Sequence, residues 1–247
     1  MKVISVVAGK GGVGKTTMSI ATVKALGKKY KVGLLDADIT GANTHKFLEI
    51  VENFDFKGGS KEMKITPSKA KLDGIDIEFM SIALLSETFV HWNPGEHGDF
   101  IKQIIEQTEW DVDYLIIDAP PGTHDELIES LNFSDVVILV TIPSELSHMD
   151  AKRTIELLAY MEKPIAGQIV NMSHSICPKC GEKIEIFKGN KGLDGIPVIE
   201  EVPIMDGVPE LDIDKLEKHI NKPITIKVDK KSLKMFFLKM VLKRLGK

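Results

Sequence analysis

The sequence predicts an α/β fold in which a mostly parallel, twisted sheet is flanked by helices on both faces. Short apolar runs alternate with helix-like stretches along the 247 residues, which is the pattern of strand–helix–strand units. Several runs, such as 136–140, are apolar without alternation and therefore fit strands that are covered from both sides. A glycine-rich stretch directly after the first run is typical of the turn from a parallel strand into a helix.

Seven apolar runs are expected to form the strands, at 2–8, 31–36, 75–80, 113–118, 135–141, 165–171 and 197–202. Ligands bind at the carboxyl ends of such strands, so polar residues that close these runs should converge on one edge of the sheet. The interval 52–71 is expected to be a surface excursion that is partly a hairpin. In the irregular segment 91–98, before a helix that begins near Asp99, His91 and His97 are expected to be solvated rather than metal ligands.

Length and composition predict a single domain that spans residues 1–247. The chain is 43% hydrophobic, which suffices for a sizeable core. A net charge of −4 and a pI near 6.0 argue against a strongly basic nucleic-acid-binding protein. The first apolar run is too short for a signal peptide or a membrane span, and the two cysteines make no disulfide framework. We therefore expect a cytoplasmic protein.

Residues 9–17 read GKGGVGKTT and match the phosphate-loop pattern G-x-x-x-x-G-K-[ST]. Glycines allow successive backbone N–H groups to surround phosphate oxygens, and the following helix adds the positive end of its dipole. Lys15 should reach the β- and γ-phosphates, and the Thr16 hydroxyl should bind Mg²⁺. The loop residues expected to bind nucleotide are Gly9, Lys10, Gly11, Gly12, Val13, Gly14, Lys15, Thr16 and Thr17.

Carboxylates close two of the predicted strands. Asp36 and Asp38 end the second run, where an acid pair can be a plain turn, although the phosphate loop upstream favours a role beside Mg²⁺. Asp118 follows four apolar residues, as does the Walker B aspartate that holds the Mg²⁺ water shell. We predict that Thr16, Asp36 and Asp118 form the magnesium site. Gly122, after two prolines, is expected to bring its N–H close to the γ-phosphate.

Cys177 and Cys180 form a C-P-x-C-G segment whose two thiolates can bind one metal centre. Zinc and iron–sulfur sites generally have four ligands, so histidines or another subunit must complete the set. His174, three residues before Cys177, could supply a local third ligand. Two such pairs at a two-fold axis would make a Cys₄ site for a [4Fe-4S] cluster or for tetrahedral zinc. A structural zinc knuckle and a redox dithiol remain the alternatives.

The loop with both Lys10 and Lys15 resembles the deviant Walker A motif of the superclass that contains MinD, ParA, ArsA and the nitrogenase iron protein. The resemblance implies a MinD-like P-loop NTPase fold and an ATP-dependent homodimer in which Lys10 touches the partner's nucleotide. It also implies that Asp38 orients the attacking water, so Lys10, Lys15 and Asp38 are the candidate catalytic residues. Hydrolysis is expected to be slow and to act as a switch.

The same superclass pattern assigns the base pocket. Asn171, at the end of a predicted strand, matches the asparagine that hydrogen-bonds the adenine ring. The segment after Pro203, which includes Met205, matches the loop that closes over the base. These roles are what the resemblance implies.

Longer segments resemble the narrower Mrp/ApbC branch, cytosolic ATPases that assemble or carry iron–sulfur clusters. They are residues 36–41, 113–123 and 171–180. This likeness implies ATP, Mg²⁺ and a [4Fe-4S] cluster bridged between two subunits at Cys177 and Cys180, with apo iron–sulfur proteins as recipients. The chain departs from the branch at 41–43, where Gly-Ala-Asn replaces Gly-Pro-Ser, and at 92–95, where Trp-Asn-Pro-Gly replaces Trp-Arg-Gly-Pro.

Two other functions compete with the carrier. A MinD/ParA-like positioning ATPase would use the cysteines for a structural zinc at the dimer interface. An electron-transfer ATPase like the nitrogenase iron protein ranks lowest, because that group separates its two cluster cysteines widely in sequence. The basic amphipathic tail 230–247 could lie on an anionic membrane, but packing on its own domain or on a partner is favoured.

Overall fold

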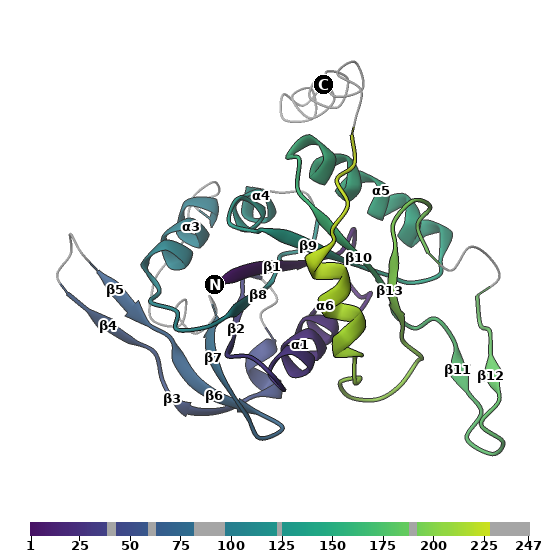
Figure 1. Ribbon diagram of the computed structural model, residues 1–247, viewed down its shortest axis with the longest axis horizontal. Coiled ribbons are helices and arrows are strands. Elements are labelled where there is room, and N and C mark those ends of the chain that lie inside the picture. Colours follow the sequence, from purple (N-terminus) through teal and green to yellow (C-terminus); the bar gives the residue numbers. More distant parts are fainter. Residues whose placement is uncertain (39–42, 59–62, 82–96, 123–124, 188–191, 228–247) are drawn as a thin grey trace.

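The computed structural model describes residues 1–38, 43–58, 63–81, 97–122, 125–187 and 192–227. A nine-stranded sheet forms its centre, in the order β13-β10-β9-β1-β8-β2-β7-β6-β3 (Figure 1). The strands from β13 to β7 in this order are parallel. They are β1 (Lys2–Val7), β2 (Val32–Asp36), β7 (Ile75–Ser81), β8 (Tyr114–Asp118), β9 (Val136–Thr141), β10 (Ile165–Val170) and β13 (Val198–Glu201). Each coincides with one of the apolar runs, so the predicted parallel sheet is confirmed.

The excursion after β2 extends the sheet with antiparallel strands. A 3₁₀ turn (Thr44–Phe47) leads into β3 (Glu49–Glu52), and β6 (Ser68–Leu72) pairs with both β3 and β7. Alternate residues of β6 are buried, as expected for an antiparallel strand with one solvated face. Between them, β4 (Asp55–Lys57) and β5 (Lys64–Thr66) form a two-stranded ribbon at the left end of the molecule in Figure 1. The predicted hairpin therefore exists as a small sheet of its own, whereas β3 and β6 make the central sheet mixed.

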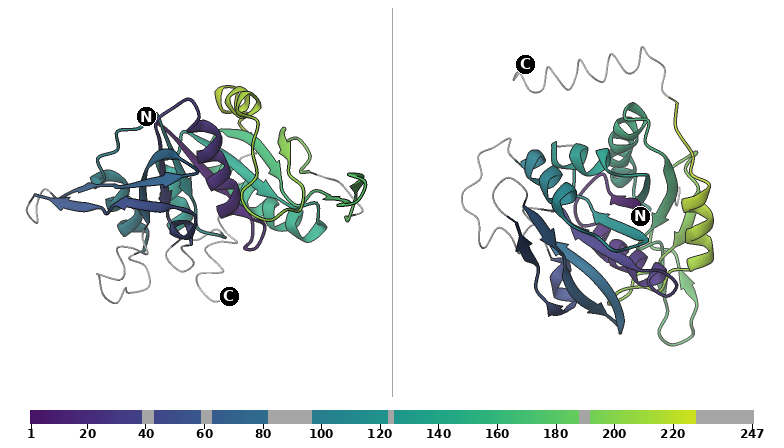
Figure 2. Two further views of the ribbon diagram at one scale, coloured as in Figure 1. Left: turned by 90° about the horizontal axis from the view of Figure 1, so that it is seen from below. Right: turned by 60° about the vertical axis from the view of Figure 1, so that its left-hand side comes forward.

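Helices cover both faces of the sheet (Figures 1 and 2). One face carries α1 (Lys15–Leu26) and α6 (Ile213–Asn221), and the other carries α3 (His97–Gln107), α4 (Asp125–Asn132) and α5 (Glu145–Tyr160). The core is correspondingly split into a cluster under α1 and α6 and two clusters under α3, α4 and α5. Every residue of β9 is buried, which is the reason for its unbroken apolar sequence.

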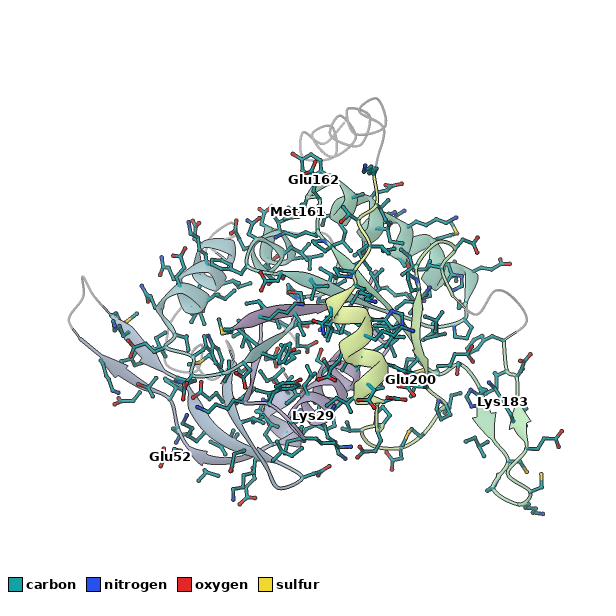
Figure 3. All side chains as sticks on the ribbon, viewed as in Figure 1. Lys29, Glu52, Met161, Glu162, Lys183 and Glu200 are labelled. Carbon is teal, nitrogen blue, oxygen red and sulfur yellow. The ribbon has the colours of Figure 1, made fainter. Side chains whose placement is uncertain are left out.

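Helix α6 is fixed mainly by burial of its apolar stripe. Leu216 and Ile220 are fully buried, and Asp212 caps the helix by accepting hydrogen bonds from the N–H groups of residues 214 and 215. Lys29, labelled in Figure 3, adds ion pairs to Asp214 and Glu217 at 3.1 and 3.3 Å. Such exposed pairs contribute little, so the buried stripe holds the helix.

The cysteine segment forms a separate hairpin of β11 (Ser175–Ile176) and β12 (Lys183–Ile184). It lies beyond β13, at the end of the molecule opposite the β4–β5 ribbon (Figures 1 and 2). Several earlier expectations fall outside the described residues: those on His91, on residues 92–95, on 41–42 and on the tail 230–247. Among the described residues, no helix combines the length and apolar character needed to cross a bilayer.

Candidate functional site

The phosphate loop joins β1 to α1 at the carboxyl edge of the sheet. Gly12 and Gly14 have φ values of +79° and +86°, in the left-handed region where a Cβ costs about 1–2 kcal/mol. Gly14 directly precedes α1, which begins at Lys15 as expected. Gly12 and Gly14 are therefore required by the backbone path of the loop.

Gly9 brings the loop against α5. A Cβ at this position would lie 2.4 Å from the backbone nitrogen of Ala151 and 2.7 Å from the carbonyl oxygen of Asp150. Only glycine permits this approach. The next residue, Lys10, is half-buried at the start of the loop.

The Asp118 carboxylate accepts hydrogen bonds from three side chains of α1. Lys15 Nζ lies 2.6 Å from its Oδ1, Thr16 Oγ1 donates to Oδ2 at 2.7 Å, and Ser19 Oγ donates to Oδ1 at 2.8 Å. The carboxylate is 1% exposed. The structure thus brings Lys15, predicted for the phosphates, together with Thr16 and Asp118, predicted for Mg²⁺. Ser19 was missed, although its position one helical turn after Lys15 puts it on the same face of α1.

Asp36 stands beside Asp118, because β2 and β8 pair these two residues in register. It accepts hydrogen bonds from Thr44 Oγ1 at 2.5 Å, from Thr44 N at 3.2 Å and from Asp38 N at 3.2 Å. Burial, followed by the charge of Asp118, raises the pKa of Asp36 despite these hydrogen bonds. Thr44 was not identified from the sequence, since eight residues separate it from its partner.

The oxygen atoms at this edge fit a magnesium ion. Asp36 and Asp118 are both buried, and adjacent strands lie about 4.8 Å apart, so the two carboxylates repel each other and favour a bound cation. In this structure the Lys15 ammonium pairs with Asp118. With the Thr16 hydroxyl the two carboxylates form an all-oxygen donor set, which Mg²⁺ prefers. Asp38 is half-buried directly after Asp36, and Gly122 has a φ of +92° at the end of the segment after β8. The roles assigned to these residues remain predictions.

A pocket of about 110 Å³ opens beside the loop. Asn171 Nδ2 donates to the carbonyl of Val13 at 2.9 Å and so joins the end of β10 to the phosphate loop. The pocket is lined by Gly14, Thr17, Met18, Asn171, Met172, Val202, Pro203, Ile204, Met205, Gly207 and Pro209. The structure therefore brings Asn171, Pro203 and Met205 to one pocket at the loop, as the base-binding hypothesis requires.

The hairpin turn presents both thiols at the surface. Cys177 is half-buried and Cys180 is exposed. Cys177 N donates to Glu182 O and Gly181 N donates to Cys177 O, each at 2.9 Å, and Gly181 has a φ of +74°. Backbone N–H groups of Cys180 and Lys179, together with the Cys180 side chain, lower the pKa of the Cys177 thiol. A turn that stabilises thiolate is suited to binding a metal or cluster.

The local third ligand suggested at His174 is not supported. His174 Nδ1 is 2.6 Å from Ser173 Oγ, and the described residues contain no group of three or more His, Cys, Asp or Glu side chains that could hold a metal. Within the described part of the chain, the site therefore has only two ligands, the thiols of Cys177 and Cys180. The hairpin lies at one end of the molecule (Figure 1), and Cys180 is exposed there, so a second molecule can approach it.

Sequence comparison relates the chain to iron-transfer proteins. The family model described as ParA, NUBPL iron-transfer P-loop NTPase, matches residues 1–243. A relative in Pyrococcus horikoshii named iron-sulfur cluster carrier protein is 34% identical over 94% of this chain and 82% of its own length. The cytosolic Fe-S cluster assembly factor CFD1 of Kluyveromyces lactis is 36% identical over 82% of this chain and 76% of its own.

Structural comparison agrees with this relationship. A nucleotide-binding protein from Archaeoglobus fulgidus, solved in complex with ADP, has a TM-score of 0.64 at 26% identity, covering 89% of this chain and 85% of that one. MinD from Pyrococcus horikoshii, complexed with Mg-ADP, has a TM-score of 0.57 at 18% identity over 90% of this chain and 96% of that one, and so shares the fold. The chain belongs to the ParA/NUBPL family of iron-transfer P-loop NTPases.

Proposed function

We propose that this protein is an ATP-dependent carrier or scaffold for iron–sulfur clusters, acting as a homodimer in the cytoplasm and delivering [4Fe-4S] clusters to apo proteins. The observation that carries the proposal is the presence, in one chain, of a P-loop site and of an exposed hairpin with two thiols that lacks further ligands among the described residues. Relatives named as carriers and assembly factors at 34–36% identity support it.

In this proposal ATP binds at the loop 9–17 with its base in the pocket beside Asn171. Lys15 exchanges the Asp118 carboxylate for phosphate oxygens, while Thr16, Asp36 and Asp118 hold Mg²⁺. Asp38 orients the attacking water, and Lys10 reaches the nucleotide of the partner. Bound Mg²⁺ supplies positive charge to the phosphates and offsets the repulsion between the two buried aspartates.

The cluster is the cargo. Two hairpins, one from each protomer, would place the four thiolates of two C-x-x-C pairs around one [4Fe-4S] cluster. Closure of the dimer on ATP binding would tighten the cluster site, and hydrolysis of ATP would loosen it so that the cluster can leave.

Anaerobic reconstitution with iron and sulfide tests the proposal. We expect about four irons per two chains and a dimer of about twice the 27.4 kDa chain mass. The double variant Cys177→Ala/Cys180→Ala should bind no cluster, whereas Lys15→Ala should lose ATP binding. Iron binding that survives removal of both thiols, or a chain that stays monomeric with ATP and cluster, would contradict the proposal.

The positioning ATPase with a structural zinc is the second candidate. Its support is weaker, because the MinD structural neighbour is only 18% identical and shares the fold alone. Metal analysis of anaerobically purified protein separates the two: one zinc per two chains without iron would favour a structural staple. Sedimentation with anionic vesicles, with and without residues 230–247, tests the membrane contact.

A further inference from the structure

The wall of the base pocket and the base of the cysteine hairpin are hydrogen-bonded to each other. Val202 and Ile204 line the pocket. Val202 O accepts hydrogen bonds from Ser173 N at 2.9 Å and from Ser173 Oγ at 3.0 Å, and Ile204 N donates to His174 O at 2.7 Å. Ser173 and Val202 are each 3% exposed, so the two bonds between them are shielded from water.

The covalent connection between the pocket and the thiols is short. Asn171 bonds to the phosphate loop, Met172 lines the pocket, and β11 begins at Ser175. Met172 has a φ of +52°, a left-handed conformation that costs a side-chain-bearing residue about 1–2 kcal/mol. Cys177 is six residues beyond Asn171, a reach of about 20 Å at most in extended chain. A displacement of the pocket wall can therefore be relieved over only a few residues before it reaches the thiols.

The returning end of the hairpin segment is fixed separately. The buried Gln168 amide donates to Leu193 O at 3.0 Å and to Ile196 O at 2.8 Å, and it accepts from Leu193 N at 2.9 Å. Lys183, which Figure 3 marks on the hairpin, adds a partly exposed ion pair to Glu201 at 3.3 Å. With the return anchored on β10, movement of the Val202–Ile204 wall should act on the hairpin through Ser173 and His174.

We propose that Ser173 is a positioning residue through which occupancy of the base pocket sets the conformation of the cysteine hairpin. ADP and ATP carry the same base, so either nucleotide should change the hairpin through Ser173. This effect arises within a single protomer and does not require the dimer to close around the γ-phosphate. The inference rests on the proposed function in taking the pocket beside Asn171 as the base site and Cys177 and Cys180 as the cargo site.

Hydrogen–deuterium exchange of the full-length, reduced protein without metal tests this route. The readout is the exchange of amides in 175–184, which include the bonded N–H groups of Cys177 and Gly181. Wild type is compared alone, with MgADP, with a non-hydrolysable MgATP analogue and with magnesium pyrophosphate. We expect both adenine nucleotides to change hairpin exchange by about fivefold or more, the lower range of measured site-to-site coupling, and pyrophosphate to change it little.

Ser173→Ala removes the hydroxyl bond to Val202 O and leaves the two backbone bonds, so it should weaken this response. ADP affinity should change less than about threefold, since no nucleotide contact is removed. Ser173→Thr, which keeps the hydroxyl, should restore part of it. Ser175→Ala in β11, outside these hydrogen bonds, is the matched control and should respond as wild type does.

Three results would overturn the inference: a response to the ATP analogue but not to ADP, an equal response to pyrophosphate, or a full response in Ser173→Ala. Each leaves cluster reconstitution unaffected. Conversely, failure to bind a cluster with an intact exchange response would reject the carrier function and retain the link between pocket and hairpin.

Discussion

The Asn171 side chain occupies the space that a Cβ on Gly14 would need. Its Nδ2 atom, which donates to Val13 O at 2.9 Å, lies 2.2 Å from the ideal Cβ position at Gly14. The end of β10 and the phosphate loop are thus packed so closely that loop conformation and base pocket depend on each other. This relationship gives the first prediction.

Gly14→Ala should destabilise the nucleotide-free protein by about 2 kcal/mol or more, because left-handed strain and the collision with Asn171 add. For a chain of this size that corresponds to a fall in Tm of about 4–8 °C. Gly11→Ala is the matched control, since nothing lies within 4 Å of a Cβ there. Calorimetry of both variants measures the difference, and equal Tm values would refute the packing argument.

Binding of MgADP should weaken as the pH falls through the raised pKa of Asp36. Below that pKa the carboxyl group is protonated and cannot bind Mg²⁺. The loss of MgADP affinity should therefore begin at a pH above 3.8, the ordinary pKa of an aspartate. Titration calorimetry in several buffers should also detect proton release on binding at mildly acidic pH. In Asp36→Asn both effects should disappear, and an unchanged pH dependence in this variant would assign it to another group.

In the metal-free protein the raised pKa of Asp36 makes the fold more stable as the pH falls, whereas MgADP binding weakens as the pH falls. A carboxyl group whose pKa is raised by folding stabilises the fold most at low pH, and this contribution is lost as the pH rises through the folded-state pKa. Added Mg²⁺ should therefore raise Tm more at neutral pH than in acid. A Tm increase that does not depend on pH would argue against the cation lying beside Asp36.

Gln168→Leu should lower the free energy of unfolding by about 2–4 kcal/mol, because it removes the side-chain partner of the buried Leu193 N–H and Ile196 carbonyl groups. Denaturant titration provides the measurement. Gln103→Leu, on the exposed face of α3, makes the same chemical change and should stay within about 0.5 kcal/mol of wild type. Similar losses in the two variants would mean that the anchor contributes nothing specific.

Cys177 should react with iodoacetamide faster than Cys180 near neutral pH, even though Cys180 is the more exposed thiol. Backbone N–H groups of Cys180 and Lys179 lower the pKa of Cys177 below its ordinary value of 9.0, which increases the thiolate fraction. Mass spectrometry of partly alkylated, metal-free protein resolves the two sites. Faster labelling of Cys180 would show that exposure outweighs thiolate formation.

The local pattern of the sequence determined the parallel sheet and the phosphate loop. Each central strand is a continuous apolar run because it is covered on both faces, and the loop uses consecutive backbone groups, so both leave a contiguous signal. The polar residues that close the runs could likewise be placed on one edge. The resemblance supplied the base-pocket residues, which single positions such as Asn171 and Pro203 do not reveal by themselves.

Only the tertiary structure decided which side chains complete the site. Ser19 and Asp118 are 99 positions apart, and Thr44 lies eight positions from Asp36, to which it donates a hydrogen bond. The hydrogen bonds between Ser173 and Val202 depend on how β10 and β13 align. The suggestion of His174 as a third ligand is not supported, because spacing in sequence alone does not bring a side chain to a metal site. Contacts of this kind arise from strand register and helix packing, which bring together residues that no short segment of sequence relates.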